Sequence, residues 1–231
     1  MSRLSRFLMV GMAVLLAGAS ILITPGCGSS DHAFIRFVHA SPDAPNVDIL
    51  IDGKSVATNV AYAGSTNYLE VHDGSRHIQV NATGTATTLI DVNQNLNKGA
   101  YYTGLAVGEV SDSSLTGLLI TDDHSAPQSG QVKLRVIQAS PTAGAVDIYV
   151  QAPGTLAANP TVTNLPFKSV TQFASVVAGS YEVFVTTTGT TTVVFDSGGV
   201  AYTAGQVRTA VLLDAPGGGS PLTATVLKDL N

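Results

Sequence analysis

The chain contains the same phrase twice, about one hundred residues apart. Residues 34–53 read FIRFVHASPDAPNVDILIDG, and residues 133–154 read KLRVIQASPTAGAVDIYVQAPG. At an offset of 99 residues, Arg36 aligns with Arg135 and the two Ala-Ser-Pro runs align with each other. Weaker matches continue at offsets of 105 to 107 to the end of the chain, and the changes in offset fall in loops between predicted strands. A repeat of this length predicts one folding unit that is present twice.

Each unit has the composition and the periodicity of an all-β domain. Only 12% of the residues are charged, whereas Thr and Val, which favour strands because they are branched at Cβ, are frequent. Short apolar runs alternate with turn-forming Gly, Pro, Asn and Asp, and seven such runs in one unit predict a two-sheet β-sandwich. In the first unit the predicted strands are 34–39, 46–52, 65–71, 76–82, 87–92, 101–107 and 115–121.

We therefore expect two tandem β-sandwich domains, of the Ig-like or Greek-key type, after an N-terminal signal segment. The segment between the two domains is short and polar, so it should restrict how freely they move relative to each other. The expected boundaries are 1–26 for a lipoprotein-type signal peptide, 27–31 for a tether, 32–124 for the first sandwich, 125–130 for the linker and 131–231 for the second sandwich.

The N-terminus has the pattern of an export signal. Arg3 and Arg6 precede an apolar stretch over 7–23, which is followed by small and turn-forming residues. The single cysteine of the chain, Cys27, comes directly after Gly26. This arrangement resembles the lipobox of bacterial lipoproteins. The resemblance implies that the signal peptide is cut before Cys27 and that Cys27 carries the lipid.

Three interpretations of this N-terminus stay open. They are acylation of Cys27, ordinary cleavage that leaves a free thiol, and an uncleaved membrane anchor. The apolar run is slightly shorter than the ~20 residues of a typical span, which counts against the uncleaved anchor. Acylation would anchor the protein stably, since two or more acyl chains hold a protein on a membrane where one does not. All three place the β-domains outside the cytoplasm. We expect a lipid-anchored protein of the cell envelope, at the outer membrane or facing the periplasm, with the membrane as a partner.

The repeated phrase contains side chains that could form a site. His39, Ser41, Asp43 and Asp48 carry the groups of a hydrolytic site or of a metal cage. In the second copy, however, Gln and Thr replace His39 and Asp43, and we interpret what is retained as a structural motif. The retained residues of this motif are Arg36, Ser41, Pro42, Asp48, Arg135, Ser140, Pro141 and Asp147.

The motif suggests a role for each of its residue types. Ser-Pro opens a turn, because Pro fixes its own φ and Ser can bond a neighbouring backbone N–H. The Arg and the Asp are predicted to lie on adjacent strands, where Arg36 would pair with Asp48 and Arg135 with Asp147 to fix the register. The alternatives are a ligand site on this phrase, or a hydrolase that uses His39 of the first copy.

Other candidate sites are weaker. His72 and His77 flank the Asp73-Gly74 turn and could form a metal site, and Asp122-Asp123-His124 could hold a divalent cation. Exposed polar residues are the simpler interpretation of both groups, because the second copy has Val177 and Glu182 at the histidine positions and boundary segments are commonly polar. Calcium is weakly supported, because the sequence has no Asp-x-Asp-x-Asp run. The sequence also has no nucleotide-binding loop and no Gly-x-Ser-x-Gly. We expect no enzyme, no cofactor and no metal, and the net charge of −5 without a basic stripe predicts no nucleic-acid partner.

Four segments carry a resemblance to a known family. RFVHASPDAPNVDILIDG, NVAYAGSTNYLEV, DGSRHIQVNATG and NKGAYYTGLAVG resemble the bacterial envelope domain-of-unknown-function family 4397. The resemblance extends over both copies and implies export, tandem β-domains and no established activity. We expect a non-catalytic envelope lipoprotein that acts as a structural or interaction module, with an envelope protein or a polysaccharide as candidate partner. The alternative is a carbohydrate-binding or adhesive module.

Overall fold

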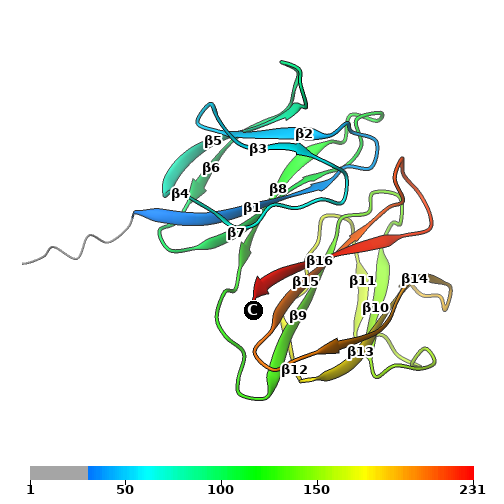
Figure 1. Ribbon diagram of the computed structural model, residues 1–231. Coiled ribbons are helices and arrows are strands. Elements are labelled where there is room, and N and C mark those ends of the chain that lie inside the picture. Colours follow the sequence, from blue (N-terminus) through cyan, green and yellow to red (C-terminus); the bar gives the residue numbers. More distant parts are fainter. Residues whose placement is uncertain (1–30) are drawn as a thin grey trace, which may run out of the picture. The chain divides into compact units, whose positions relative to one another are not determined.

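The computed structural model describes residues 31–231, which contain sixteen strands and no helix (Figure 1). The strands form four sheets of four strands each, and the sheets pair into two sandwiches. The prediction of an all-β sandwich fold is confirmed. The predicted signal peptide and Cys27 lie outside the described residues. Among the residues that the structure describes, no helix is long and apolar enough to cross a membrane.

The first eight strands build what we call the N-terminal sandwich. They are β1 (His32–Ala40), β2 (Val47–Ile51), β3 (Lys54–Val60), β4 (Leu69–His72), β5 (Gly74–Ala82), β6 (Thr88–Leu96), β7 (Tyr101–Val107) and β8 (Thr116–Asp122). One sheet has the order β4-β1-β7-β8 and the other the order β3-β2-β5-β6. The pair β1–β7 is parallel, and the other neighbours are antiparallel.

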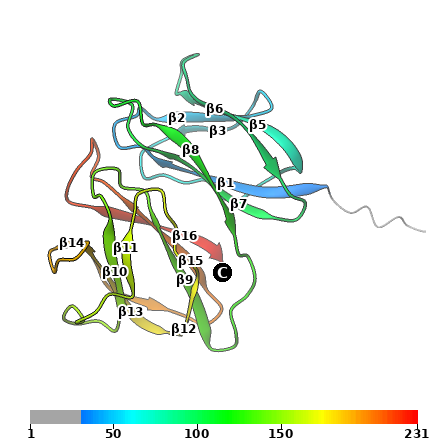
Figure 2. The same ribbon diagram turned by 180° about the vertical axis from the view of Figure 1, so that it is seen from behind.

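The remaining eight strands build the C-terminal sandwich. They are β9 (Gln131–Gln138), β10 (Val146–Gln151), β11 (Val162–Leu165), β12 (Ala174–Val177), β13 (Gly179–Thr187), β14 (Val193–Tyr202), β15 (Val207–Leu213) and β16 (Thr223–Leu230). The sheet orders are β12-β9-β15-β16 and β11-β10-β13-β14, and the parallel pair is β9–β15. The strand order is therefore the same in both sandwiches (Figure 2).

Each sandwich has one strand more than the seven that the sequence predicts. In the N-terminal sandwich the additional strand is β3, whose sequence KSVATNV lacks a buried residue. It lies at the edge of its sheet, where only one side of its backbone is paired. Polar edge strands carry little apolar alternation, so their sequence signal is weak.

Strand β1 is buried on both faces. Ile35 and Phe37 belong to the core between the two sheets of the N-terminal sandwich. Val38 and Ala40 belong instead to a core that also contains residues of the C-terminal sandwich. A strand that is covered on both sides shows no regular polar alternation, and the two polar residues of FIRFVHA, Arg36 and His39, are themselves buried.

The second core joins the two sandwiches. Val38 and Leu105 of the N-terminal sandwich share a buried cluster with Ile137, Val211 and Leu227 of the C-terminal one. The sheets that contain β1 and β9 therefore pack on each other, and residues 31–231 form one compact unit.

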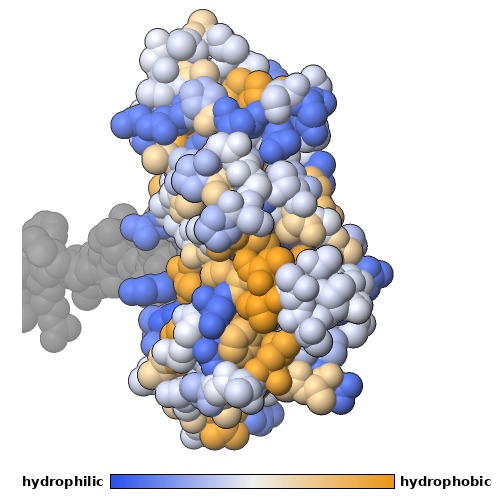
Figure 3. Space-filling view, turned by 90° about the vertical axis from the view of Figure 1, so that its right-hand side faces the viewer, coloured by the Kyte–Doolittle hydropathy of each residue, from blue (hydrophilic) through white to orange (hydrophobic). Residues whose placement is uncertain are grey.

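Apolar side chains also reach the surface of the described residues, and Figure 3 shows where they gather on one face. The large apolar side chains that are most exposed are all valines, and five of the six belong to the C-terminal half. They are Val110, Val170, Val177, Val193, Val200 and Val226.

The shared core predicts that the two sandwiches unfold together. Ile137 is 0% exposed in this core, so Ile137→Ala should lower the free energy of unfolding by about 2–5 kcal/mol. The matched variant Val177→Ala, at a side chain that is 67% exposed, should cost less than about 0.5 kcal/mol. Urea unfolding followed by circular dichroism and by tyrosine fluorescence should give one coincident transition. Two separate transitions would contradict the shared core.

Candidate functional site

The arginine of the first repeated phrase lies in a buried polar network between the sandwiches. Arg36 on β1 places its Nη2 2.6 Å from Oδ1 of Asp229 on β16. Its Nε donates to Oγ1 of Thr103 on β7 at 2.9 Å. The side chains of Arg36 and Asp229 are 3% and 0% exposed, so this ion pair is shielded from water.

The arginine of the second phrase makes the equivalent contacts, from the C-terminal sandwich to the N-terminal one. Nε of Arg135 on β9 donates to Oγ1 of Thr209 on β15 at 2.8 Å. Nη2 of Arg135 binds Oδ1 of Asp122 on β8. Each arginine thus binds the threonine of its own sandwich and the aspartate of the other one.

Further contacts complete this reciprocal network. Thr103 donates to Asp122 at 2.6 Å, and Thr209 donates to Asp229 at 2.8 Å. Tyr68 donates to Asp122 at 2.7 Å. With two arginines and two aspartates the network is electrically balanced, which offsets part of the cost of removing four charges from water.

Two aromatic rings cover the arginines. The Tyr68 ring lies 4.6 Å from the guanidinium of Arg36, and the Phe173 ring lies 4.5 Å from that of Arg135. Burial raises the pKa of the Tyr68 hydroxyl, so this group stays a hydrogen-bond donor. Burial also raises the pKa of Asp229, and the charge of Arg36 opposes that shift.

The predicted pairing of Arg36 with Asp48 is wrong, as is that of Arg135 with Asp147. Strands β1 and β2 belong to different sheets of the sandwich, so Arg36 and Asp48 are not neighbours on adjacent strands. The same separation holds for β9 and β10. The assumption that failed is that strands consecutive in sequence pair with each other.

Both aspartates instead bind backbone N–H groups of the neighbouring edge strands, β3 and β11. Asp48 accepts from Asn59 N at 2.7 Å, and Asp147 accepts from Asn164 N at 2.7 Å. These two asparagines have φ values of 54° and 53°, a left-handed conformation that Asn tolerates better than most residues. Hydrogen bonds from Asn59 and Asn164 are the main reason why the pKa of each carboxyl lies below its ordinary value.

His39 braces the Ser-Pro turn of the first phrase. It is 1% exposed, and its Nε2 lies 3.0 Å from the carbonyl oxygen of Pro45. Its Nδ1 accepts from the backbone N of Ser41, the serine of the repeated motif, at 3.4 Å. Burial lowers the pKa of His39. Both ring nitrogens are thus engaged by the backbone of the turn that Pro42 continues.

Gln138 makes the same two contacts in the second phrase. Its Nε2 donates to the carbonyl oxygen of Gly144 at 2.9 Å, and its Oε1 accepts from Ser140 N at 3.0 Å. Pro141 follows Ser140 in this turn, as Pro42 follows Ser41 in the first. The exchange of His for Gln therefore preserves the hydrogen-bonding pattern rather than a proton-transfer group.

Asp43 is also occupied by the backbone. Its two carboxylate oxygens accept from Val110 N and Ser111 N, both at 2.8 Å. These contacts fix the β7–β8 loop against the first phrase. The polar side chains that the sequence offered as a hydrolytic site are therefore held by backbone groups of turns.

Comparison with known proteins shows the family. The model of a domain of unknown function, DUF4397, matches residues 33–149. The chain belongs to the DUF4397 family. The match begins in β1 and ends in β10, so it contains the N-terminal sandwich and the first two strands of the C-terminal one. No curated protein matches this DUF4397 chain.

Two solved structures are distantly similar to the DUF4397 chain. One is the carbohydrate-binding module CBMbc (family CBM26) from Eubacterium rectale Amy13K in complex with maltoheptaose, with 12% identity over 87% of this chain and 98% of that one. The other is a leucine-rich repeat protein from Bacteroides thetaiotaomicron, with 12% identity over 81% of this chain and 27% of that one. Their TM-scores of 0.27 and 0.21 are too low to inform the function.

The candidate metal ligands of the DUF4397 chain have separate partners. His77 lies 2.6 Å from Asp91, whereas the ring of His72 lies 5.0 Å from that of His32, which in turn contacts Glu70. Within residues 31–231, no group of three or more His, Cys, Asp or Glu side chains is arranged to hold a metal ion.

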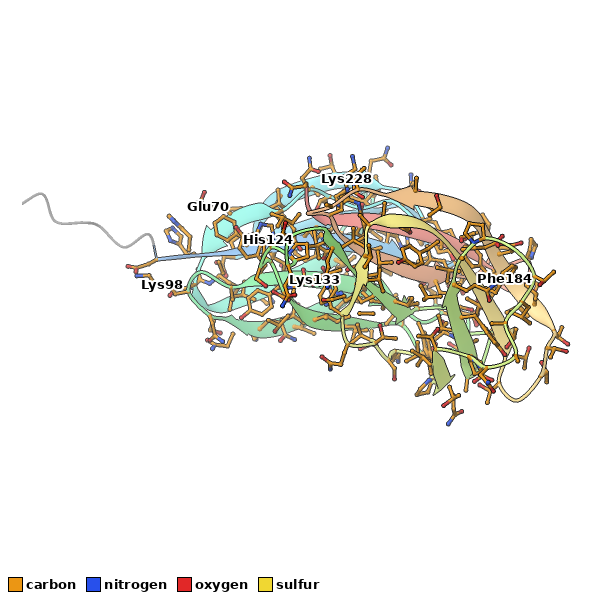
Figure 4. The ribbon with its side chains drawn as sticks, turned by 90° about the horizontal axis from the view of Figure 1, so that it is seen from below. Glu70, Lys98, His124, Lys133, Phe184 and Lys228 are labelled. Carbon is orange, nitrogen blue, oxygen red and sulfur yellow. The ribbon has the colours of Figure 1, made fainter. Side chains whose placement is uncertain are left out.

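The Asp122-Asp123-His124 run of the DUF4397 chain is likewise divided. Asp122 belongs to the buried network, and Asp123 binds Lys133 at 2.6 Å. The His124 ring stacks on Tyr101 at a centroid distance of 3.8 Å. Figure 4 labels His124 and Lys133, which lie where the chain passes from one sandwich to the other. These contacts attach the connecting segment to both sandwiches.

Sequence reasoning missed the acidic partners of the arginines. Asp122 and Asp229 align at an offset of 107 residues, and Thr103 and Thr209 align at 106. Aspartate is uncommon at the end of an apolar strand, and here both copies retain it. The presence of this aspartate in both copies could have indicated that it is the buried partner of the arginine that both copies also share.

The network predicts that removing the charge of either aspartate lowers the stability of the protein by a large and similar amount. Asp229→Asn leaves buried Arg36 with only Asp122, at 3.7 Å, as a shared counter-charge and should lower the free energy of unfolding by about 3–5 kcal/mol. Asp122→Asn should have a similar effect through Arg135. The control Lys98→Ala removes an ion pair whose side chains are 43% and 72% exposed, and should cost less than about 1 kcal/mol. Urea denaturation measures all three, and an effect of Asp229→Asn as small as the control's would refute the network.

The two turns provide a matched test of His39. His39→Gln should change the free energy of unfolding by less than about 1 kcal/mol, because Gln138 shows that Gln can make both bonds. His39→Ala should cost at least about 1–3 kcal/mol, since it leaves backbone groups of the turn unpaired. Thermal and urea unfolding check both variants. Equal stability of the two variants would show that these hydrogen bonds do not hold the turn.

Proposed function

We propose that this chain is a non-catalytic module of the cell envelope, anchored through a lipid on Cys27, with a structural or interaction role. We further propose that residues 131–231 are a second, diverged copy of the DUF4397 domain. In this account the segments 1–26 and 27–31 are a signal peptide and a tether, and the two sandwiches form the exported part.

The strand arrangement supports the second copy. In the N-terminal sandwich Ile35 lies opposite Tyr102 in the parallel β1–β7 pair. In the C-terminal sandwich Leu134 lies opposite Arg208 in the β9–β15 pair, which is the equivalent register. The same sheet order and the same register in two segments with a shared motif are what duplication of one domain produces.

One observation carries the non-catalytic role: the polar residues shared by the two copies have structural partners. The arginines bind aspartates across the buried network, and Asp48 and Asp147 bind backbone N–H groups. His39, the best candidate for a general base, is fully buried and bonded to a turn at both nitrogens. A general base needs access to the proton that it removes.

A structural or interaction role also suits the shared core. A body whose two sandwiches pack through a common core can present its outer sheets in a fixed relation. Cys27 precedes His32, the first residue of β1, by five positions, so the tether would span at most about 18 Å. A lipid on Cys27 would therefore hold this body close to the membrane surface.

Mass spectrometry of the mature protein tests the anchor. The expected N-terminus is Cys27 with a mass increase equal to its acyl chains, and Cys27→Ser should abolish that increase and release the protein from the membrane fraction. A mature N-terminus at another residue, or an unmodified thiol at Cys27, would contradict the proposal. In parallel, a polysaccharide pulldown that retains the protein would favour the alternative role as a carbohydrate-binding or adhesive module.

A further inference from the structure

The C-terminal sandwich has a cavity between its two sheets. The cavity contains about 560 Å³ of empty space, including the part that is open to solvent. Most of its wall is apolar, and the side chains that matter here are Val136, Val150, Ala174, Val183, Tyr202 and Arg208.

Two large side chains of the N-terminal sandwich have smaller counterparts at this cavity, although the N-terminal sandwich also has a hollow between its sheets, which Phe37 lines. Phe37 lies opposite Gly104 in the β1–β7 pair, and the residue at the equivalent register of β9 is Val136. Leu69 of β4 is likewise replaced by Ala174 of β12. Both substitutions remove volume from the same region between the sheets.

Core residues of the C-terminal sandwich are also more exposed than their counterparts in the N-terminal sandwich. Ile35 is 0% exposed and Ile78 is 5% exposed in the core of the N-terminal sandwich. Their counterparts Leu134 and Val183 are only partly buried, although both belong to central strands. Leu134 and Val183, which line the cavity, are therefore more exposed than their counterparts in the N-terminal sandwich.

A buried cation lies in the wall of the cavity. Arg208 is 8% exposed and occupies the register position that Tyr102 has in the N-terminal sandwich. Its Nη1 donates to the carbonyl oxygens of Val207 and Leu230, at 2.9 and 2.8 Å. Within residues 31–231, no carboxylate lies within 4.0 Å of its guanidinium, and its Nε and Nη2 donate to no described residue.

This arginine differs from the other two buried arginines of the chain. Arg36 and Arg135 each have an aspartate as counter-ion, whereas Arg208 has only backbone carbonyls. Burial is the main cause that lowers the pKa of Arg208, and the charge of Asp229, which already pairs with Arg36, opposes that shift. An anion in the cavity would supply the missing partner, because a guanidinium can bind a carboxylate through two parallel hydrogen bonds.

We propose that this cavity binds a small amphiphile with one carboxylate head group, whose head pairs with Arg208 and whose apolar chain lies along Val136, Val150 and Val183. An apolar wall with one well-placed charged group is the usual construction of a small-molecule site. A neutral molecule of the same shape would fill the space but leave Arg208 unpaired, so the site should discriminate by charge. This proposal does not depend on the lipid anchor or on the structural role.

Calorimetric titration of the full chain with decanoate tests the proposal, with decanol as the neutral probe of equal chain length. Decanoate should bind one-to-one, and decanol should bind at least about tenfold more weakly. Arg208→Gln should weaken decanoate binding by about 10- to 100-fold and leave decanol binding unchanged. The control Arg76→Gln removes an arginine that is already paired with Asp52 on the surface, and it should leave both affinities unchanged.

A second variant tests the cavity independently of the charge. Val136→Phe combined with Ala174→Leu and Ala210→Gly introduces the residues of the N-terminal sandwich, where Phe37 packs on Gly104, and should abolish binding of both probes without lowering the Tm. The proposal is overturned if decanoate does not bind, if decanol binds equally well, or if Arg208→Gln retains the affinity. It is also overturned if the protein with the filled cavity still binds decanoate.

Discussion

Two buried arginines, each paired with an aspartate of the other sandwich, impose the main constraint on this structure. Arg36 and Asp229 are 193 residues apart in sequence and 2.6 Å apart in space. A buried arginine without its aspartate would be strongly unfavourable, so each sandwich requires the other to satisfy its own charge. The apolar core around Val38, Leu105 and Ile137 supplies the main favourable energy, whereas the charged pairs fix which surfaces meet.

This constraint explains what the two copies share and where they differ. The shared arginine, threonine and aspartate meet at the surface between the sandwiches, where each copy contributes the same groups. The serine-proline turns lie at the ends of β1 and β9, braced by His39 in one copy and by Gln138 in the other. Away from these positions the copies diverge, and the clearest case is Tyr102, which becomes Arg208 beside a cavity.

The sequence predicts the local features of the fold better than its long-range contacts. Alternation in RHIQVNA and the turn at Asp73-Gly74 give the strands, because both are encoded within a few residues. The polar edge strand β3 has no such signal and was missed. The pairing of Arg36 with Asp48 requires β1 and β2 to be adjacent strands of one sheet, but they lie in different sheets. Only the retention of Asp122 and Asp229 at matching positions could have indicated the correct partners.

A double-mutant cycle across the interface tests the central claim most directly. Urea unfolding of the protein with Arg36→Met, with Asp229→Leu and with both changes gives the coupling energy between these two side chains. The account predicts a coupling of at least about 1.5 kcal/mol, with the double variant more stable than either single variant, because no buried charge is then left without its partner. A coupling near zero, with the two single effects simply adding, would contradict it.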